Sequence, residues 1–204
     1  MKKVWLTLSL AFMAATSAFA DNAILGKIET QCNSVTSIVS DFDQVKTIAA
    51  NGKQIASDGV LYYTADKFAM HYTDAAKEML IINGNDFFMI RNGRKALFNT
   101  EKNKPMQSLS NTLLMCMSGD LQQLADQNNA DITATDKGSF YEVILTARQK
   151  SVKGYATIVL NYDKTTGLLT KMVMNEFNGN STSYALSGIK KNVEIEAGKF
   201  EISR

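Results

Sequence analysis

Histidine, cysteine and proline are scarce in this chain of 204 residues, and their scarcity excludes several kinds of active site. His71 is the only histidine, and no serine, cysteine or acidic residue around it has the spacing of a catalytic triad or a metal site. The sequence also lacks a glycine-rich phosphate-binding loop and a Cys-x-x-Cys pair. We therefore predict that the protein is not an enzyme and that it uses no metal ion and no cofactor.

The first twenty residues predict export from the cytoplasm. Two lysines precede an apolar run over residues 4–15, and alanines stand one and three positions before Asp21, as in a cleaved signal peptide. The run is shorter than the about 20 apolar residues that span a membrane, so an uncleaved anchor is the less favoured alternative. We expect residues 1–20 to be a signal peptide and residues 21–204 to be one exported domain.

Charge is balanced in the part of the chain that follows the expected signal peptide. Twenty-two basic and twenty acidic residues become twenty of each once residues 1–20 are removed. No basic patch with interleaved aromatic residues is present, which argues against nucleic acid, and no polybasic tract is present to hold anionic lipid headgroups. We expect a monomer that is not embedded in a membrane.

Alternation of apolar and polar residues with a period of two predicts strands over most of the chain. Turn residues separate these runs, and Asn-Gly, the strongest short-range hairpin signal, recurs among them. Consecutive strands joined in this way form an antiparallel meander. The expected strands are 37–49, 54–64, 67–73, 78–82, 86–91, 95–99, 130–135, 139–147, 154–162, 168–177 and 181–187, with a last one near 200–202.

Helical spacing of apolar residues replaces this alternation in two places. An amphipathic helix is expected near residues 22–36. A second helix should begin at Pro105 and carry apolar residues as far as Met117, and Asp120 can cap a short third helix. About eleven strands are more than a flat sheet holds comfortably, so the sheet should curl. We predict a mainly β (α+β) fold, an unclosed β-barrel with an N-terminal helix and inserted lid helices.

Four segments follow one another in a recognisable order, namely Val35–Gln44, Gly59–Tyr63, Lys67–Tyr72 and Met79–Ile90. This order resembles the LolA-type periplasmic outer-membrane lipoprotein carriers, of which the chain would be a divergent member. That family has, in the same order, a phenylalanine–x–glutamine strand start, a glycine–x–leucine–aromatic strand, an aromatic strand, and a hydrophobic strand that turns at a glycine. The best-known carriers also have an arginine and a proline after the second strand, but residues 63–66 contain neither, so no latch residue is carried over.

The resemblance implies a function in lipoprotein transport and outer-membrane biogenesis. The hydrophobic cavity would hold the acyl chains of a lipoprotein while the carrier crosses the periplasm of a Gram-negative bacterium. The cargo would come from an inner-membrane lipoprotein-releasing transporter and pass to an outer-membrane receptor. The alternative is a periplasmic sensing or scaffold module of the same fold, in which Arg91, Arg94 and Lys95 contact a protein partner, although such a charged hairpin is more often simply solvated.

Candidate cavity residues come from the apolar strands and from the inserted helices. Phe68, Met70 and Tyr72 share one face of their strand, whereas in residues 79–82 the sequence leaves open which alternate pair faces inward. Without the resemblance, the methionines are typical of an ordinary core. The candidates are Phe68, Met70, Tyr72, Met79, Ile81, Phe87, Met89, Met106, Leu109, Leu113 and Met117.

The two cysteines, Cys32 and Cys116, lie on the first helix and on the first inserted helix. In an oxidising compartment they could form a disulfide that ties the inserted helix to the N-terminal helix. The alternative is two separate buried thiols, and the sequence leaves both open.

Overall fold

A computed structural model of the protein describes residues 21–73, 78–150 and 154–202. It contains one antiparallel sheet of eleven strands in the order β6-β5-β4-β3-β2-β1-β11-β10-β9-β8-β7. The predicted signal peptide lies outside the described residues and stays a prediction. The elements after the N-terminal helix (residues 21–32) are β1 Ser37–Ile48, β2 Lys53–Thr64, β3 Lys67–Tyr72, β4 Met79–Asn83, β5 Asp86–Arg91, β6 Arg94–Asn99, α2 Lys104–Ser118, α3 Leu121–Gln127, β7 Ala130–Asp136, β8 Phe140–Ala147, β9 Tyr155–Asp163, β10 Leu169–Glu176, β11 Ser181–Lys191 and the 3-10 helix η1 Ala197–Phe200.

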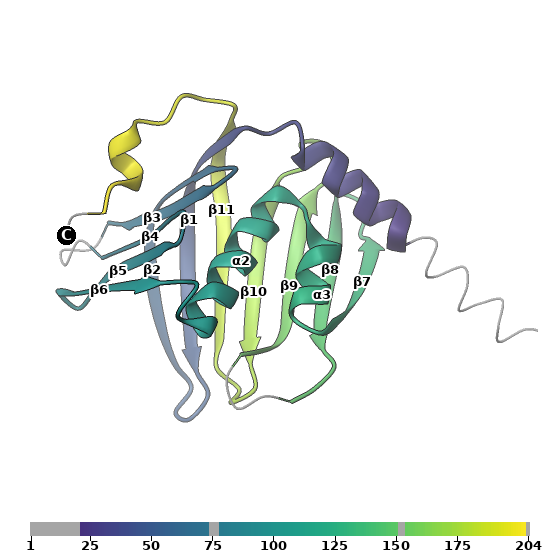
Figure 1. Ribbon diagram of the computed structural model, residues 1–204. Coiled ribbons are helices and arrows are strands. Elements are labelled where there is room, and N and C mark those ends of the chain that lie inside the picture. The colour runs from purple at the N-terminus through teal and green to yellow at the C-terminus, as the bar shows by residue number, and fades with distance from the viewer. Residues whose placement is uncertain (1–20, 74–77, 151–153, 203–204) are drawn as a thin grey trace, which may run out of the picture.

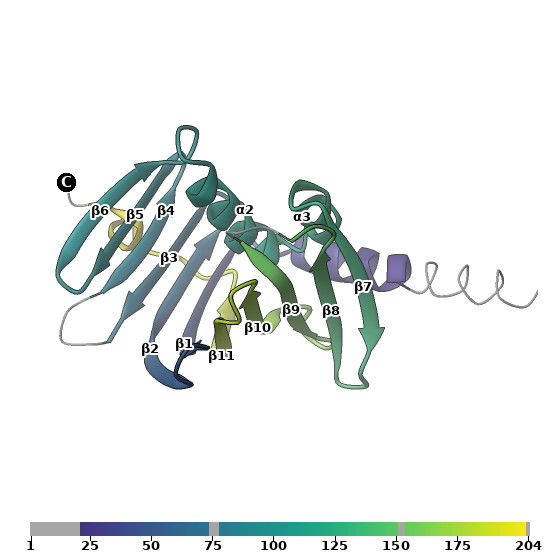
Figure 2. The same ribbon diagram turned by 90° about the horizontal axis from the view of Figure 1, so that it is seen from below.

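The sheet consists of two meanders that meet where the first strand pairs with the last. One arm runs from β1 to β6 and the other from β7 to β11, and the pairing of β1 with β11 joins them. The strands β6 and β7 end the sheet at opposite edges and do not pair with each other, so the barrel is unclosed. Figure 2 shows the sheet as a trough, with α2 and α3 lying across it between these two edges. The predicted fold class is confirmed.

Local sequence explains where α2 begins and ends. The side chain of Asn103 accepts a hydrogen bond from the backbone N–H of Met106 at 3.3 Å, and Pro105 stands in the first turn, where its missing N–H costs nothing. Gly119 adopts a left-handed conformation with φ of 79° and donates its N–H to the carbonyl of Met115, which is a common end for a helix. The local sequence therefore determines both ends of α2.

The core lies between the concave face of the sheet and the two inserted helices. Alternate residues of each strand point to this face, and they pack with the undersides of α2 and α3 in one large cluster that includes Phe42, Phe87, Val143 and Leu160. The N-terminal helix lies across one end of strands β7 to β10 (Figure 1).

The last residues of the chain do not form the strand expected near 200–202. They form η1 and an extended end that pack against the outer, convex face of β3 and β4. His71 Nε2 lies 2.9 Å from the carbonyl oxygen of Lys199, and Asn83 donates to the carbonyl of Phe200 at 3.2 Å. Because β3 and β4 already pair on both sides, the segment finds no free strand edge and can only cover the face.

Candidate functional site

The predicted cavity residues of β3 and β5 lie on the concave face. Phe68, Met70 and Phe87 are almost fully buried there, and Tyr72 and Met89 are partly buried against the same cluster. Tyr72 packs edge-on against Phe42, with 5.1 Å between the ring centres. This part of the concave face is thus continuous and apolar.

Met79 and Ile81, also predicted to line the cavity, point to the opposite face. The pairing of β3 with β4 places Ile82 opposite Phe68 and Leu80 opposite Met70, so Leu80 and Ile82 face the concave side. Ile81 instead packs on the outer face in a second cluster with Phe200. Four consecutive apolar residues on β4 hid this parity, because both faces of the strand are covered in the folded chain.

The C-terminal half of α2 packs tightly against the middle of the concave face. Leu113, Cys116 and Met117 lie against Phe68 and Met70, and the space left among these residues and their neighbours is only about 10 Å³. No cargo fits in so small a space. Leu113 and Met117, predicted to line the cavity, therefore seal this part of the interior in the described conformation.

A larger cavity of about 540 Å³ opens beneath the N-terminal half of α2. Met106 and Leu109 are the predicted residues that line it, and the remaining walls come from the end of α3 and from strands β7 to β10. Sequence reasoning missed these walls, although the alternation of apolar residues along β8 and β9 indicates that Leu145 and Ile158 face the interior. The lining residues are Pro105, Met106, Ser108, Leu109, Gln127, Asn128, Ala130, Leu145, Ala147, Gln149, Gly154, Tyr155, Thr157, Ile158, Glu176 and Phe177.

Two polar side chains of the cavity wall, Tyr155 and Glu176, are cross-strand neighbours on β9 and β10. Burial, and secondly the nearby Glu176 carboxylate, raise the pKa of Tyr155 to about 12, so its phenol stays protonated at neutral pH. Glu176 Oε2 accepts a hydrogen bond from Asn178 Nδ2 at 2.9 Å. The cavity thus combines apolar walls with one oriented carboxylate.

One buried hydrogen bond fixes the C-terminal end of α2 to strand β9 of the sheet. The hydroxyl of Tyr162 on β9 donates to the backbone carbonyl of Cys116 at 2.6 Å, and both residues are completely buried. This carbonyl belongs to the last turn of the helix, where intrahelical partners are missing. Burial raises the pKa of Tyr162 well above its usual value, so the hydroxyl keeps the proton that it donates.

The two cysteines are free and buried, so the disulfide alternative is not what the structure contains. Cys32 donates its thiol to the carbonyl of Gly167 at 3.4 Å, and Cys116 lies on the buried face of α2. Burial raises the pKa of Cys32 to about 11 and that of Cys116 to about 12. Thiols with such pKa values are inert near neutral pH, so both act as small apolar core residues.

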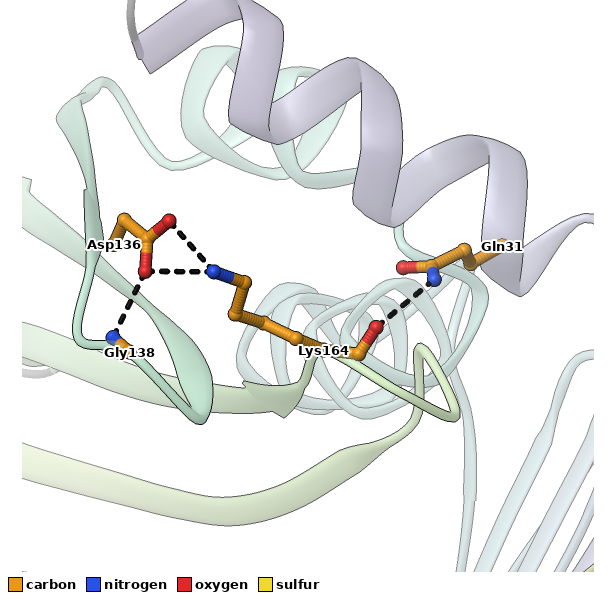
Figure 3. A network of polar contacts seen from close by, with 4 residues as sticks. All are labelled: Gln31, Asp136, Gly138 and Lys164. Atoms are coloured by element: carbon orange, nitrogen blue, oxygen red, sulfur yellow. Dashed lines mark hydrogen bonds and ion pairs between the residues drawn. The ribbon is translucent and has the colours of Figure 1, made fainter.

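Polar contacts tie the N-terminal helix to the ends of the β7–β10 arm. Lys164 pairs with Asp136 at 2.7 Å, and Gln31 of the N-terminal helix donates to the carbonyl of Lys164 at 3.3 Å (Figure 3). The hydrogen bond from Lys164, and then that from the N–H of Gly138, lower the pKa of Asp136. The partly exposed Lys164–Asp136 pair adds little stability, and the bond from Gln31 orients the helix.

No group of metal-ligating side chains is found among residues 21–73, 78–150 and 154–202. No helix within the same residues is long and apolar enough to cross a membrane. His71, the only histidine, contacts the C-terminal segment on the outer face and lies away from the cavity.

Comparison with known proteins identifies relatives by family and by fold. The sequence model of the family described as outer membrane lipoprotein carrier protein LolA matches residues 33–203. No curated protein matches the sequence.

Among solved structures, the MucA/MucB complex of Pseudomonas aeruginosa contains a similar chain, with a TM-score of 0.51 and 11% identity. The match covers 90% of this chain but only 61% of that one. A further structure of MucB gives 0.53 and 12%, covering 90% of this chain and 63% of that one. An uncharacterized conserved protein of Thermus thermophilus gives 0.52 and 9%, covering 91% of this chain and 95% of that one. At these identities the likeness shows the fold.

Proposed function

The chain belongs to the LolA family of outer membrane lipoprotein carriers, and on that premise we propose that it binds the acyl chains of lipoproteins and carries them across the periplasm. The observation that supports this most directly is the cavity of about 540 Å³ beneath α2, which continues the apolar concave face. Its size lies within the range of about 300–1,000 Å³ that is usual for ligand sites.

The physical need for such a cavity follows from the cost of exposing acyl chains to water. Each buried methylene is worth about 0.8 kcal/mol, so an acyl chain of ordinary length crosses water only inside an apolar shell. Leu109, Leu145 and Ile158 supply apolar walls at this place. A carrier without catalytic groups needs only such a surface and a way to open it.

The contacts of α2 indicate how the cavity could enlarge. Its C-terminal end is held by Tyr162, whereas Met106 and Leu109 near its N-terminal end border the cavity. Displacement of the helix away from the sheet would join the cavity to the apolar surface of Phe68 and Met70. In this proposal α2 is the lid, and an inner-membrane transporter loads the carrier that an outer-membrane receptor later unloads.

Mass spectrometry of organic extracts of the protein, purified from its native source, tests whether acyl chains are bound. A titration with a fluorescent acyl probe then compares Ala147→Trp with Thr146→Trp. These neighbours lie on opposite faces of β8, since Ala147 lines the cavity and Thr146 is exposed. We expect the tryptophan at 147 to weaken probe binding at least tenfold and the one at 146 to leave it unchanged.

One result would refute the carrier proposal, and another would refute the cavity beneath α2 as its binding site. One is a protein that yields no acyl chains and takes up no probe; together with a tightly bound protein partner, it would favour the sensing or scaffold module. The other is equal binding by both tryptophan variants, since that would place the acyl chains elsewhere.

A further inference from the structure

The cavity beneath α2 has an electrically uneven wall. Among the described residues that line it, Glu176 is the one carboxylic acid, and none of them is a lysine, arginine or histidine. The other polar groups are neutral amides and hydroxyls. An uncompensated carboxylate at the edge of an apolar cavity favours a positively charged ligand group over a neutral or negative one.

The carboxylate of Glu176 accepts a hydrogen bond but forms no ion pair among the described residues. Oε2 accepts a hydrogen bond from Asn178, and the Glu176 backbone N–H donates to the carbonyl of Asn180 at 2.8 Å, which closes the turn after β10. Glu176 forms no ion pair with any residue that the structure describes. An ammonium ion could therefore bind here without displacing a lysine or arginine side chain of residues 21–73, 78–150 or 154–202.

Aromatic side chains accompany the carboxylate. Tyr155 is the cross-strand partner of Glu176, and Phe177 follows it in the chain and lines the same cavity. Aromatic faces attract ammonium groups through their negative electrostatic potential, and this attraction grows when water is excluded. A cavity wall that contains a carboxylate and two aromatic residues is thus suited to an alkylammonium group.

We propose that Tyr155, Glu176 and Phe177 bind the protonated amino group of an acylated ligand whose hydrocarbon chains extend toward Leu109 and Ile158. The inference rests on the proposed carrier function and adds a chemical class of ligand to it. The amino group belongs either to a lipopeptide with a free α-amine or to a lipid with an amine headgroup.

A matched pair of ligands tests this inference. One is a synthetic diacylated lipopeptide with a free α-amine, and the other is the same lipopeptide with that amine acetylated, which removes the charge and keeps the acyl chains. We expect the full chain to bind the free amine about three- to tenfold more tightly, the range for a partly exposed charged contact. Phosphatidylethanolamine and its N-acetyl derivative, compared in the same way, distinguish a lipid headgroup from a peptide amine.

Two substitutions assign the preference to one residue. Glu176→Gln keeps the shape and the bond to Asn178 but removes the charge, so it should abolish the preference for both amines. Glu29→Gln, on the exposed side of the N-terminal helix, is the control and should retain it.

Equal affinity for the free and acetylated ligands would overturn the inference while leaving the carrier proposal intact. A preference that survives in Glu176→Gln would also overturn it. Failure to bind any acylated ligand would instead refute the carrier function itself.

Discussion

Replacing Tyr162 with phenylalanine should loosen the lid without changing the packing beneath it. The substitution removes the hydroxyl that donates to the carbonyl of Cys116 at 2.6 Å and keeps the ring that fills the core. The carbonyl is completely buried and lies in the last turn of α2, so it would lose its partner with no water to replace it.

The expected loss follows from the cost of leaving a buried acceptor unsatisfied. That cost is about 1–3 kcal/mol, and each kcal/mol shifts the melting temperature of a domain of this size by about 2–4 °C. We therefore expect Tyr162→Phe to melt about 2–12 °C below the parent protein. If detachment of the α2 end limits ligand entry, uptake should be about 5- to 140-fold faster, because roughly 1.4 kcal/mol corresponds to a tenfold change in rate.

Thermal unfolding followed by circular dichroism measures the first effect, and stopped-flow uptake of a fluorescent acyl probe measures the second. Tyr141→Phe is the matched control, because Tyr141 is the cross-strand partner of Tyr162 and borders the N-terminal helix instead of α2. A variant that melts like the parent protein and takes up the probe no faster would refute the role given to this hydrogen bond.

Three further predictions concern packing and the buried thiols. Gly59→Ala would place a Cβ 2.1 Å from the carbonyl oxygen of His71, so urea unfolding should show a free energy of unfolding lower by about 1–3 kcal/mol. The control, Gly26→Ala, lies on the N-terminal helix with open space around it and should be neutral or stabilising by up to about 1 kcal/mol. Equal effects of the two substitutions would contradict the steric argument. Cys32 and Cys116 should both resist a thiol reagent at pH 8 and both react in urea without reductant, whereas a need for reductant would show a disulfide. Since folding raises the pKa of Cys32 from 9.0 to about 11, the unfolded thiol ionises first, and stability should fall by a few kcal/mol as the pH rises from about 9 to 11. Cys32→Ala should make this part of the stability profile shallower, and part of the remaining slope comes from Cys116, whose pKa folding raises from 9.0 to about 12.

Sequence reasoning predicted the elements well where local chemistry determines them. Asn-Gly turns and period-two alternation placed ten of the strands within two residues of their observed ends. The strand β11 runs on to Lys191, beyond the predicted end at residue 187, because Gly188, with φ of 58°, accompanies an irregularity in its pairing with β1 that lets the strand continue. The predicted start of the second helix at Pro105 lies one residue after the observed start of α2 at Lys104, and its last predicted apolar residue, Met117, lies one residue before the observed end at Ser118.

The position of the cavity could not be predicted in the same way, because it depends on contacts between distant segments. Tyr162 and Cys116 are 46 residues apart, and their hydrogen bond decides which end of α2 is held against the sheet. Likewise, the inward pair on β4 is set by its register with β3 and by the C-terminal segment that covers Ile81. Each of these contacts joins residues from different segments, and no local sequence pattern in either segment indicates its partner.

The pairing of β1 with β11 has a consequence for how the chain folds. Ser40 and Ser187 hydrogen-bond across this seam although 147 residues separate them, whereas the other strand pairs join consecutive strands. Long loops close slowly compared with hairpins, so we expect the two arms to form early and independently and the seam to form late. The cavity beneath α2 and the apolar surface of Phe68 and Met70 would then share one concave face only after β11 has paired with β1.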